Sequence, residues 1–226
     1  MTAWDYIAWA LTCVFGGIFP ARTALYFLAP AKGRVRWIVP YLVIGAALGM
    51  PTWAGDGNPL YYFPFLIAAF LIGYGGARAA RLVVGVIFFE WIIAWSMIVD
   101  TRAVLPGSAG YWGAMAWKFA MWAAVWLLMR RVFRDGKQVA LSGRLWALLG
   151  LLALSPLLSE LAFSMWDIRA YTIDGTDAQI DAAFYTLLPF VFVSAIALLF
   201  AVVLLSRHQA LEQEHQLADM RELYYQ

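Results

Sequence analysis

Residues 184–205, FYTLLPFVFVSAIALLFAVVLL, and residues 206–226, SRHQALEQEHQLADMRELYYQ, decide how this chain is organised. The first stretch holds no charged residue, and at ~1.5 Å of rise per residue it covers the ~30 Å hydrocarbon core of a bilayer. The second stretch is rich in Ala, Leu, Glu, Gln and Arg and contains no Gly or Pro to end a helix. The pattern predicts a transmembrane helix that continues into water as a charged helix.

The composition of the whole chain agrees with this pattern. Of 226 residues, 64% are hydrophobic and 13% are charged, whereas soluble domains carry roughly 25% charge. We therefore expect an all-α integral membrane protein that lies in the lipid bilayer. The single cysteine, Cys13, excludes an intrachain disulfide and a thiolate metal cluster, and we interpret it as a helix-packing residue.

Seven hydrophobic segments are the predicted membrane spans. They are Ala3–Leu28, Trp37–Ala54, Tyr61–Gly76, Leu82–Val99, Tyr111–Met129, Leu145–Trp166 and Phe184–Leu205. Pro20 predicts a kink in the first span, because proline removes a helix hydrogen bond. We expect residues 1–206 to form a seven-helix sensor domain and residues 207–226 to form a cytosolic signalling and dimerisation helix.

The basic residues indicate the orientation. Of the 16 Lys and Arg residues, 12 fall in four segments on one predicted side. These are Lys32, Arg34 and Arg36; Arg78 and Arg81; Arg130, Arg131, Arg134, Lys137 and Arg144; and Arg207 and Arg221. The positive-inside rule places this side in the cytoplasm, with the N-terminus outside.

Two ionisable residues lie deep within predicted spans. Glu90 is near the middle of the fourth span, and Lys118 is about a third of the way into the fifth, ~15 Å and ~12 Å from their shared outer loop at helical rise. That loop is short, so the two helices are expected to be antiparallel neighbours with a depth-matched ion pair. Because charge inside a membrane is costly, both residues are candidates for a ligand or switch site. The alternatives are a structural pair that locks two helices, or a neutral Glu90 hydrogen-bonded in the bundle.

The outer halves of the spans hold the remaining candidates. Glu160 follows Pro156 in the sixth span, where a kink would turn an acid towards an outer cavity as a ligand contact; a plain packing kink is the alternative. Trp112 and Trp166 lie at predicted outer interfaces, where aromatic residues usually act as anchors. There they can also line a pocket for an apolar or aromatic side chain of a peptide.

Motifs for catalysis are missing from this sequence. It has no Gly-rich phosphate loop, no kinase or ATPase motif and no hydrolase elbow. The only histidines, His208 and His215, have no partner residues at metal-ligand spacing. We expect no catalytic residue, no cofactor, no metal and no nucleic-acid partner for this chain.

The tail carries a family resemblance. Leu217, Met220 and Tyr224 follow a heptad-like spacing, which favours a weak homodimer helix. The segment Leu211–Gln226, LEQEHQLADMRELYYQ, resembles the linker after the last span in the AgrC-like (GHKL-type) receptor histidine kinases of Gram-positive bacteria. The resemblance implies a sensor in a bacterial cell membrane, of the kind used in quorum sensing, whose two-component output domain lies outside this sequence.

Two functional hypotheses follow. In the first, the chain is the receptor domain of a dimeric histidine kinase, which binds a secreted peptide or small amphiphile among the outer halves of its spans and signals through its last helix. In the second, it is a small transporter or permease component in which Glu90, Lys118 and Glu160 form a pathway. A receptor needs an output domain after the last helix, whereas a transporter does not.

Overall fold

A computed structural model describes residues 3–33, 36–50, 58–100, 108–133, 141–154, 158, 193, 196–197, 200–201, 203–205 and 207–221. Helix accounts for 85% of the interpretable residues, which confirms the all-α prediction. The labelled helices are α1 (Ala3–Phe15), α2 (Ile18–Ala24), α3 (Ile38–Gly49), α4 (Asn58–Gly73), α5 (Arg78–Asp100) and α6 (Ser108–Val132). An apolar helix follows at Gly143–Leu154, and we name the helix at 207–221 the tail helix.

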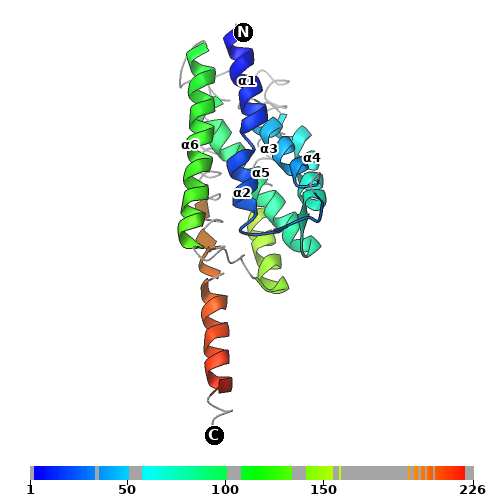
Figure 1. Cartoon of the computed structure of the whole chain (residues 1–226), viewed down its shortest axis with the longest axis vertical. Helices are drawn as coiled ribbons and strands as arrows, with labels where there is room; N and C mark the ends of the chain where they lie inside the picture. The colour runs from blue at the N-terminus through cyan, green and yellow to red at the C-terminus, as the bar shows by residue number, and fades with distance from the viewer. Residues whose placement is uncertain are drawn as a thin grey trace.

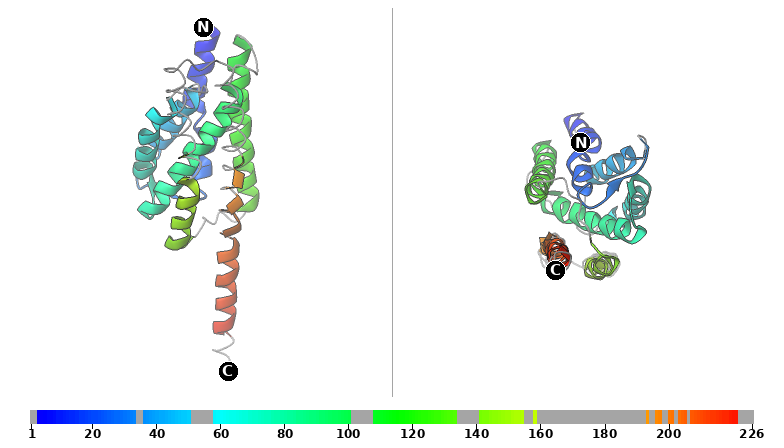
Figure 2. Two further views of the ribbon diagram at one scale, coloured as in Figure 1. Left: turned by 180° about the vertical axis from the view of Figure 1, so that it is seen from behind. Right: turned by 60° about the horizontal axis from the view of Figure 1, so that its bottom comes forward.

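The helices form an elongated bundle (Figure 1). α1 and α2 lie end to end, with α3 and α6 packed against them, and α4 joins α3 to α5. The right-hand view in Figure 2, with the bottom of the bundle turned forward, shows α5 between this group and two further helices, Gly143–Leu154 and the tail helix. The tail helix projects beyond the bundle at the end opposite the N-terminus.

The length and apolar composition of each helix decide whether it can cross a bilayer. Within the described residues, one helical segment, Tyr6–Ala24, is long and apolar enough to cross a membrane. Three further apolar helices are shorter: Ile38–Gly49, Tyr61–Gly73 and Gly143–Leu154. The number of seven spans therefore stays a prediction.

Glycine allows α1 and α3 to approach closely. A Cβ atom at Gly45 would lie within 3.0 Å of the carbonyl oxygen of Cys13, and one at Gly17 within 3.0 Å of the carbonyl oxygen of Tyr41. A Cβ atom at Gly49 would meet the Sγ atom of Cys13. Helices that approach through glycine at four-residue spacing, as at Gly45 and Gly49, are typical of membrane bundles. The same contacts place Cys13 in the helix interface.

The first helix is interrupted where the sequence predicts a kink. α1 ends at Phe15 and α2 begins at Ile18. The interruption lies at residues 16–17, and Pro20 has no N–H group to bond the carbonyl of Gly16. The hydroxyl of Tyr41, in α3, donates a hydrogen bond to the carbonyl of Val14, in the last turn of α1. A neighbouring helix thus supplies a hydrogen-bond donor at the interruption.

Two short strands at the lower end of the bundle were not predicted. β1 (Ala29–Pro30) pairs antiparallel with β2 (Tyr74–Gly75). The predicted third span, Tyr61–Gly76, is therefore wrong at its end: α4 stops at Gly73, β2 follows, and Gly76 has a φ of 105°. A positive φ is readily adopted by glycine, so the chain can turn there into α5.

Aromatic side chains fill the centre of the bundle. The rings of Phe88 in α5 and Trp122 in α6 stack with centroids 5.4 Å apart, and Trp91 lies 5.9 Å from Trp122. Phe70 of α4 and Phe27, which follows α2, both contact Phe88. Large aromatic contacts thus join the two longest helices to the rest of the bundle.

The described basic segments gather at one end of the bundle. The pairing of β1 with β2 brings the segment after Pro30 beside the start of α5. The rings of Tyr26 and Phe133 lie 6.1 Å apart, so the end of α6 lies at the same end of the bundle. A hydrogen bond of 3.2 Å from the Ser142 N–H to the Gln209 side chain joins the start of the Gly143–Leu154 helix to the tail helix. Segments that the sequence assigns to one side therefore lie together.

Candidate functional site

Lys118 occupies the buried interface of α1, α3 and α6. Its side chain is only 4% exposed, and its Nζ atom donates a hydrogen bond of 2.9 Å to the main-chain carbonyl of Leu48. Leu48 lies in the last turn of α3, where helix carbonyls lack partners within the helix and the helix dipole is negative. The ammonium group thus caps α3 from a neighbouring helix.

The surroundings of this lysine are tightly packed. Cys13 of α1 fits against Gly49, the residue after the lysine's acceptor. Thr12, also in α1, is buried and bonds back to the carbonyl of Ala8 at 2.8 Å, so its hydroxyl is satisfied within its own helix. The polar groups here belong to three helices that are far apart in the sequence.

Glu90 occupies the core of α5. Its side chain is 0% exposed, and its neighbours in the chain, Phe89 and Trp91, carry the aromatic contacts: Phe89 lies 5.7 Å from Tyr62, and Trp91 lies 5.9 Å from Trp122. A carboxylate buried in a protein core is costly unless other groups stabilise it. Glu90 is therefore a deeply placed titratable group.

Glu90 and Lys118 lie equally far along their helices from the ends that share a loop. Glu90 is ten residues before the end of α5 at Asp100, and Lys118 is ten residues after the start of α6 at Ser108, so each is ~15 Å from its helix end at 1.5 Å per residue. α5 and α6 are packed neighbours that run in opposite directions (Figure 1). The antiparallel arrangement is confirmed, and the ion pair between the two residues stays a prediction.

The buried residues Lys118 and Glu90, which we name the buried layer, suit a structural or switching role. A charged group removed from water depends on its partners, and taking away one partner is strongly destabilising. Any movement of α6 along α3 would have to break the Lys118 hydrogen bond before another could form. The layer can therefore favour discrete helix positions over continuous sliding.

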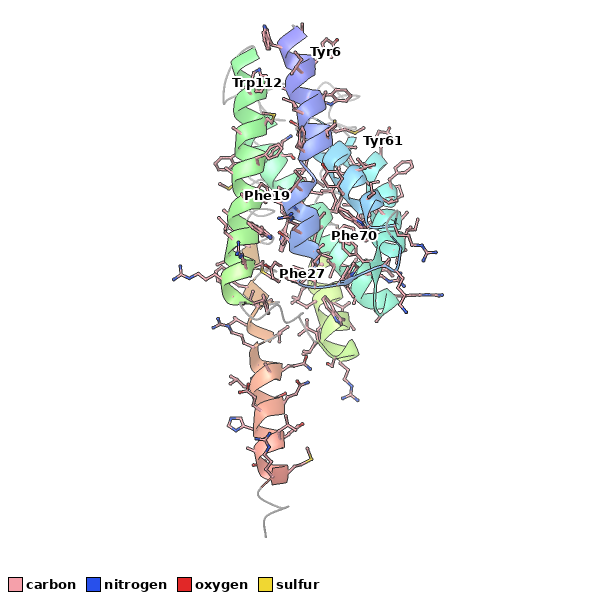
Figure 3. All side chains as sticks on the ribbon, viewed as in Figure 1. Tyr6, Phe19, Phe27, Tyr61, Phe70 and Trp112 are labelled. Carbon is pink, nitrogen blue, oxygen red and sulfur yellow. The ribbon has the colours of Figure 1, made fainter. Side chains whose placement is uncertain are left out.

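The other predicted site residues have different positions. Trp112 is half-buried near the start of α6, and Figure 3 shows it at the same end of the bundle as Tyr6, away from the tail helix. This position fits the predicted outer interface. Glu160 and Trp166 lie outside the described residues.

Two helix caps were missed by sequence reasoning. The Tyr74 hydroxyl is buried and donates to the carbonyl of Ala21, in α2, at 3.1 Å. Arg81 donates to the carbonyl of Leu71 and, at 3.3 Å, to that of Tyr74, so its guanidinium group caps the end of α4. A basic residue a few positions after a helix end was the available signal for Arg81, and Tyr74 had none.

The tail helix begins with two polar contacts. His208 lies 3.2 Å from Glu212, one turn later, and both side chains are largely exposed. Gln209 accepts the hydrogen bond from Ser142, whose own hydroxyl accepts one of 3.4 Å from the Leu145 N–H and so caps the Gly143–Leu154 helix. The tail helix is thereby attached to the start of that helix.

The described site therefore consists of a buried lysine on a helix terminus, a buried glutamate in the neighbouring helix α5 and a tail attached at the basic end. A scan against protein-family models, a search of curated proteins and a search of solved structures each found no match to this chain.

Proposed function

We propose that this chain is the membrane-embedded sensor of a bacterial receptor histidine kinase. In this proposal a secreted peptide or small amphiphile binds among the outer halves of the helices. The bundle then shifts between two arrangements, and the last helix passes the shift to a cytoplasmic output domain.

The distribution of polar and apolar side chains carries the membrane part of the proposal. The Gly143–Leu154 helix leaves Leu148, Leu151 and Leu152 exposed at 54%, 66% and 56%, whereas Glu90 and Lys118 are buried. Water-soluble monomers rarely leave large contiguous apolar patches exposed. Apolar side chains outside and ionisable ones inside are what a lipid environment favours.

The tail helix supports the signalling part. Its side chains are exposed throughout, except for the half-buried Gln209, and it extends past the bundle (Figure 1). A polar helix held at its base by Ser142 and otherwise free of the bundle is suited to change its rotation or its partner. Ligand binding can drive such a change only if the ligand has different affinities for the two arrangements.

An insertion series in the tail tests this proposal without knowledge of the ligand. The chain is fused after Gln226 to the catalytic part of a histidine kinase, and one to four alanines are inserted between Ser206 and Arg207. Each added residue rotates the tail by ~100°, so autophosphorylation in membranes is expected to rise and fall with helical period. Seven added alanines restore the heptad phase and serve as the matched control. Equal output from all insertions would contradict transmission through the tail.

The buried layer gives the transporter hypothesis its own support. Glu90 and Lys118 are both buried in the bundle interior, on the neighbouring helices α5 and α6, where ionisable groups often mark ion pathways. The test is proton flux into proteoliposomes under an imposed potential, with Glu90→Gln and Lys118→Met as variants. Flux that both variants abolish would favour a transporter, and an absence of flux in the parent chain would favour the receptor.

A further inference from the structure

The contact between α2 and α6 forms a ladder of side chains at the basic end of the bundle. Phe19 lies 5.7 Å from Trp126, on the side of α2 that faces α6 (Figure 3). Seven residues later in each segment, Tyr26, just after α2, lies 6.1 Å from Phe133, just after α6. The equal spacing of these two aromatic contacts shows that the two segments run side by side in the same direction.

Two arginines occupy the level between these aromatic pairs. Arg22 follows Phe19 by three residues, and Arg130 follows Trp126 by four, so each lies on the same helix face as the aromatic residue before it. The Arg130 guanidinium lies 5.6 Å from the Trp126 ring centre, which fixes its direction along that face. Both arginines are exposed, and their spacing places both at the level between the two aromatic pairs. We name Arg22 and Arg130, with the aromatic pairs on either side of them, the arginine step.

The helices that form the arginine step bring no negative charge. Neither α2 nor α6 contains an Asp or Glu residue. Two guanidinium groups at one level on neighbouring helices, with no acidic residue on either helix, favour the binding of an anion. Guanidinium forks bind phosphate oxygens in bidentate geometry, and aromatic rings above and below favour the boundary between hydrocarbon and headgroups.

We infer that the arginine step binds the phosphate of an anionic phospholipid, such as phosphatidylglycerol. Basic pockets between helices on the cytoplasmic side are suited to anionic headgroups. The inference rests on the proposed membrane location, because only a lipid whose acyl chains lie along α2 and α6 presents its phosphate at this level. It assigns Arg22 and Arg130 a joint role as lipid ligands.

Each arginine also lies in the last turn of its own helix, where a cation stabilises the helix dipole. That effect alone would not depend on the lipid. A lipid-dependent measurement therefore separates a binding site from a local helix contribution.

The test uses the full chain in neutral detergent, with increasing fractions of phosphatidylglycerol or, separately, phosphatidylcholine. Phosphatidylglycerol is expected to raise the thermal unfolding temperature, and phosphatidylcholine is not. In the Arg22→Gln/Arg130→Gln variant the same rise should need roughly 30-fold more phosphatidylglycerol, because each basic residue near an anionic surface contributes about 1 kcal/mol and 1.4 kcal/mol is tenfold. The matched control is Arg36→Gln/Arg144→Gln, which removes two exposed charges from the same end of the bundle, outside the arginine step.

Four results would overturn the inference: no response of the parent chain to phosphatidylglycerol, an equal loss in both double variants, an equal rise with phosphatidylcholine, or the same rise with inorganic phosphate at matched concentration. If the double variant does not fold, the single variant Arg22→Gln should need roughly fivefold more lipid, on the same 1 kcal/mol basis. Alkaline carbonate extraction tests the membrane location separately. A chain that stays in the membrane but ignores phosphatidylglycerol overturns only the lipid site, whereas release into the soluble fraction overturns the proposed function as well.

Discussion

Replacing Gly45 with alanine should separate the two helices that pack most closely. The new Cβ atom would fall within 3.0 Å of the carbonyl oxygen of Cys13, 3.2 Å from its carbonyl carbon and 3.4 Å from the nitrogen of Gly17. All three are backbone atoms, so no side-chain rotation relieves the clash. α1 and α3 would have to move apart along much of their contact.

The expected magnitude follows from two opposing effects. Overpacking a well-packed interior costs ~1–3 kcal/mol, and a rigid backbone clash belongs at the upper end of that range. Alanine regains ~1 kcal/mol of helix propensity over glycine. The Gly45→Ala variant should therefore lose about 2 kcal/mol, which at ~2–4 °C per kcal/mol lowers the unfolding temperature by about 4–8 °C.

A second glycine in the same interface should respond differently. A Cβ atom at Gly49 meets the Sγ atom of Cys13, while the nitrogen and Cβ of Cys13 stay at 3.4 and 3.5 Å. Cys13→Ala removes the sulfur, so it should restore the Gly49→Ala variant to near the stability of Cys13→Ala alone. The same substitution should not rescue Gly45→Ala, whose clash is with the backbone.

The assay is thermal unfolding of the purified chain in detergent, followed by tryptophan fluorescence. Gly143→Ala is the matched control, because a Cβ atom there meets nothing within 4 Å. Its unfolding temperature should equal or exceed that of the parent. If Gly45→Ala were as harmless as Gly143→Ala, or if Cys13→Ala rescued Gly45 and Gly49 variants equally, the close glycine contact would be refuted.

Three further outcomes are expected. Tyr74→Phe leaves a buried carbonyl of α2 without its donor and should lower stability by about 1–3 kcal/mol in the same unfolding assay; an unchanged unfolding temperature would contradict the cap. Lys118→Met keeps an unbranched side chain one atom shorter but removes the charged donor to α3, so a loss of about 1.5–3 kcal/mol is expected by the same measurement. A stabilised variant would refute the capping role. The third outcome concerns the dimer, tested in membranes with Cys13→Ser as the background. Leu217→Cys should form a disulfide-linked dimer on mild oxidation, whereas His215→Cys, two residues earlier on another face of the tail helix, should not. Equal cross-linking of both would argue against a defined dimer face.

The sequence predicted how far along its helix each ionisable side chain lies better than it predicted which partner that side chain meets. Counting residues along each span placed Glu90 ~15 Å and Lys118 ~12 Å from their shared loop, and the short loop between their spans made α5 and α6 antiparallel neighbours. Both side chains are buried in the structure. The sequence did not identify Leu48, 70 positions away, as the acceptor for Lys118. Spacing sets the height of a side chain in a helix bundle, but its rotation depends on how several helices pack together.

Features formed by distant segments escaped prediction for the same reason. The strands β1 and β2 are two residues each, too short for alternation to mark them. They pair because α2 and α4 end beside each other, which is a property of the folded bundle. The interruption before Pro20 was predictable because its cause is local, whereas its partner Tyr41 lies in another helix.

The hydrogen bond between Tyr41 and Val14 has a consequence for biogenesis. Chains emerge from the ribosome with the N-terminus first, so α1 is made before the tyrosine that completes its interrupted end, 27 residues later. A backbone carbonyl without a partner in its own helix needs a donor from water or protein. The two glycine-lined helices α1 and α3 are therefore expected to mature together as a unit, and a ribosome stalled before Tyr41 would hold a first helix that is still incomplete.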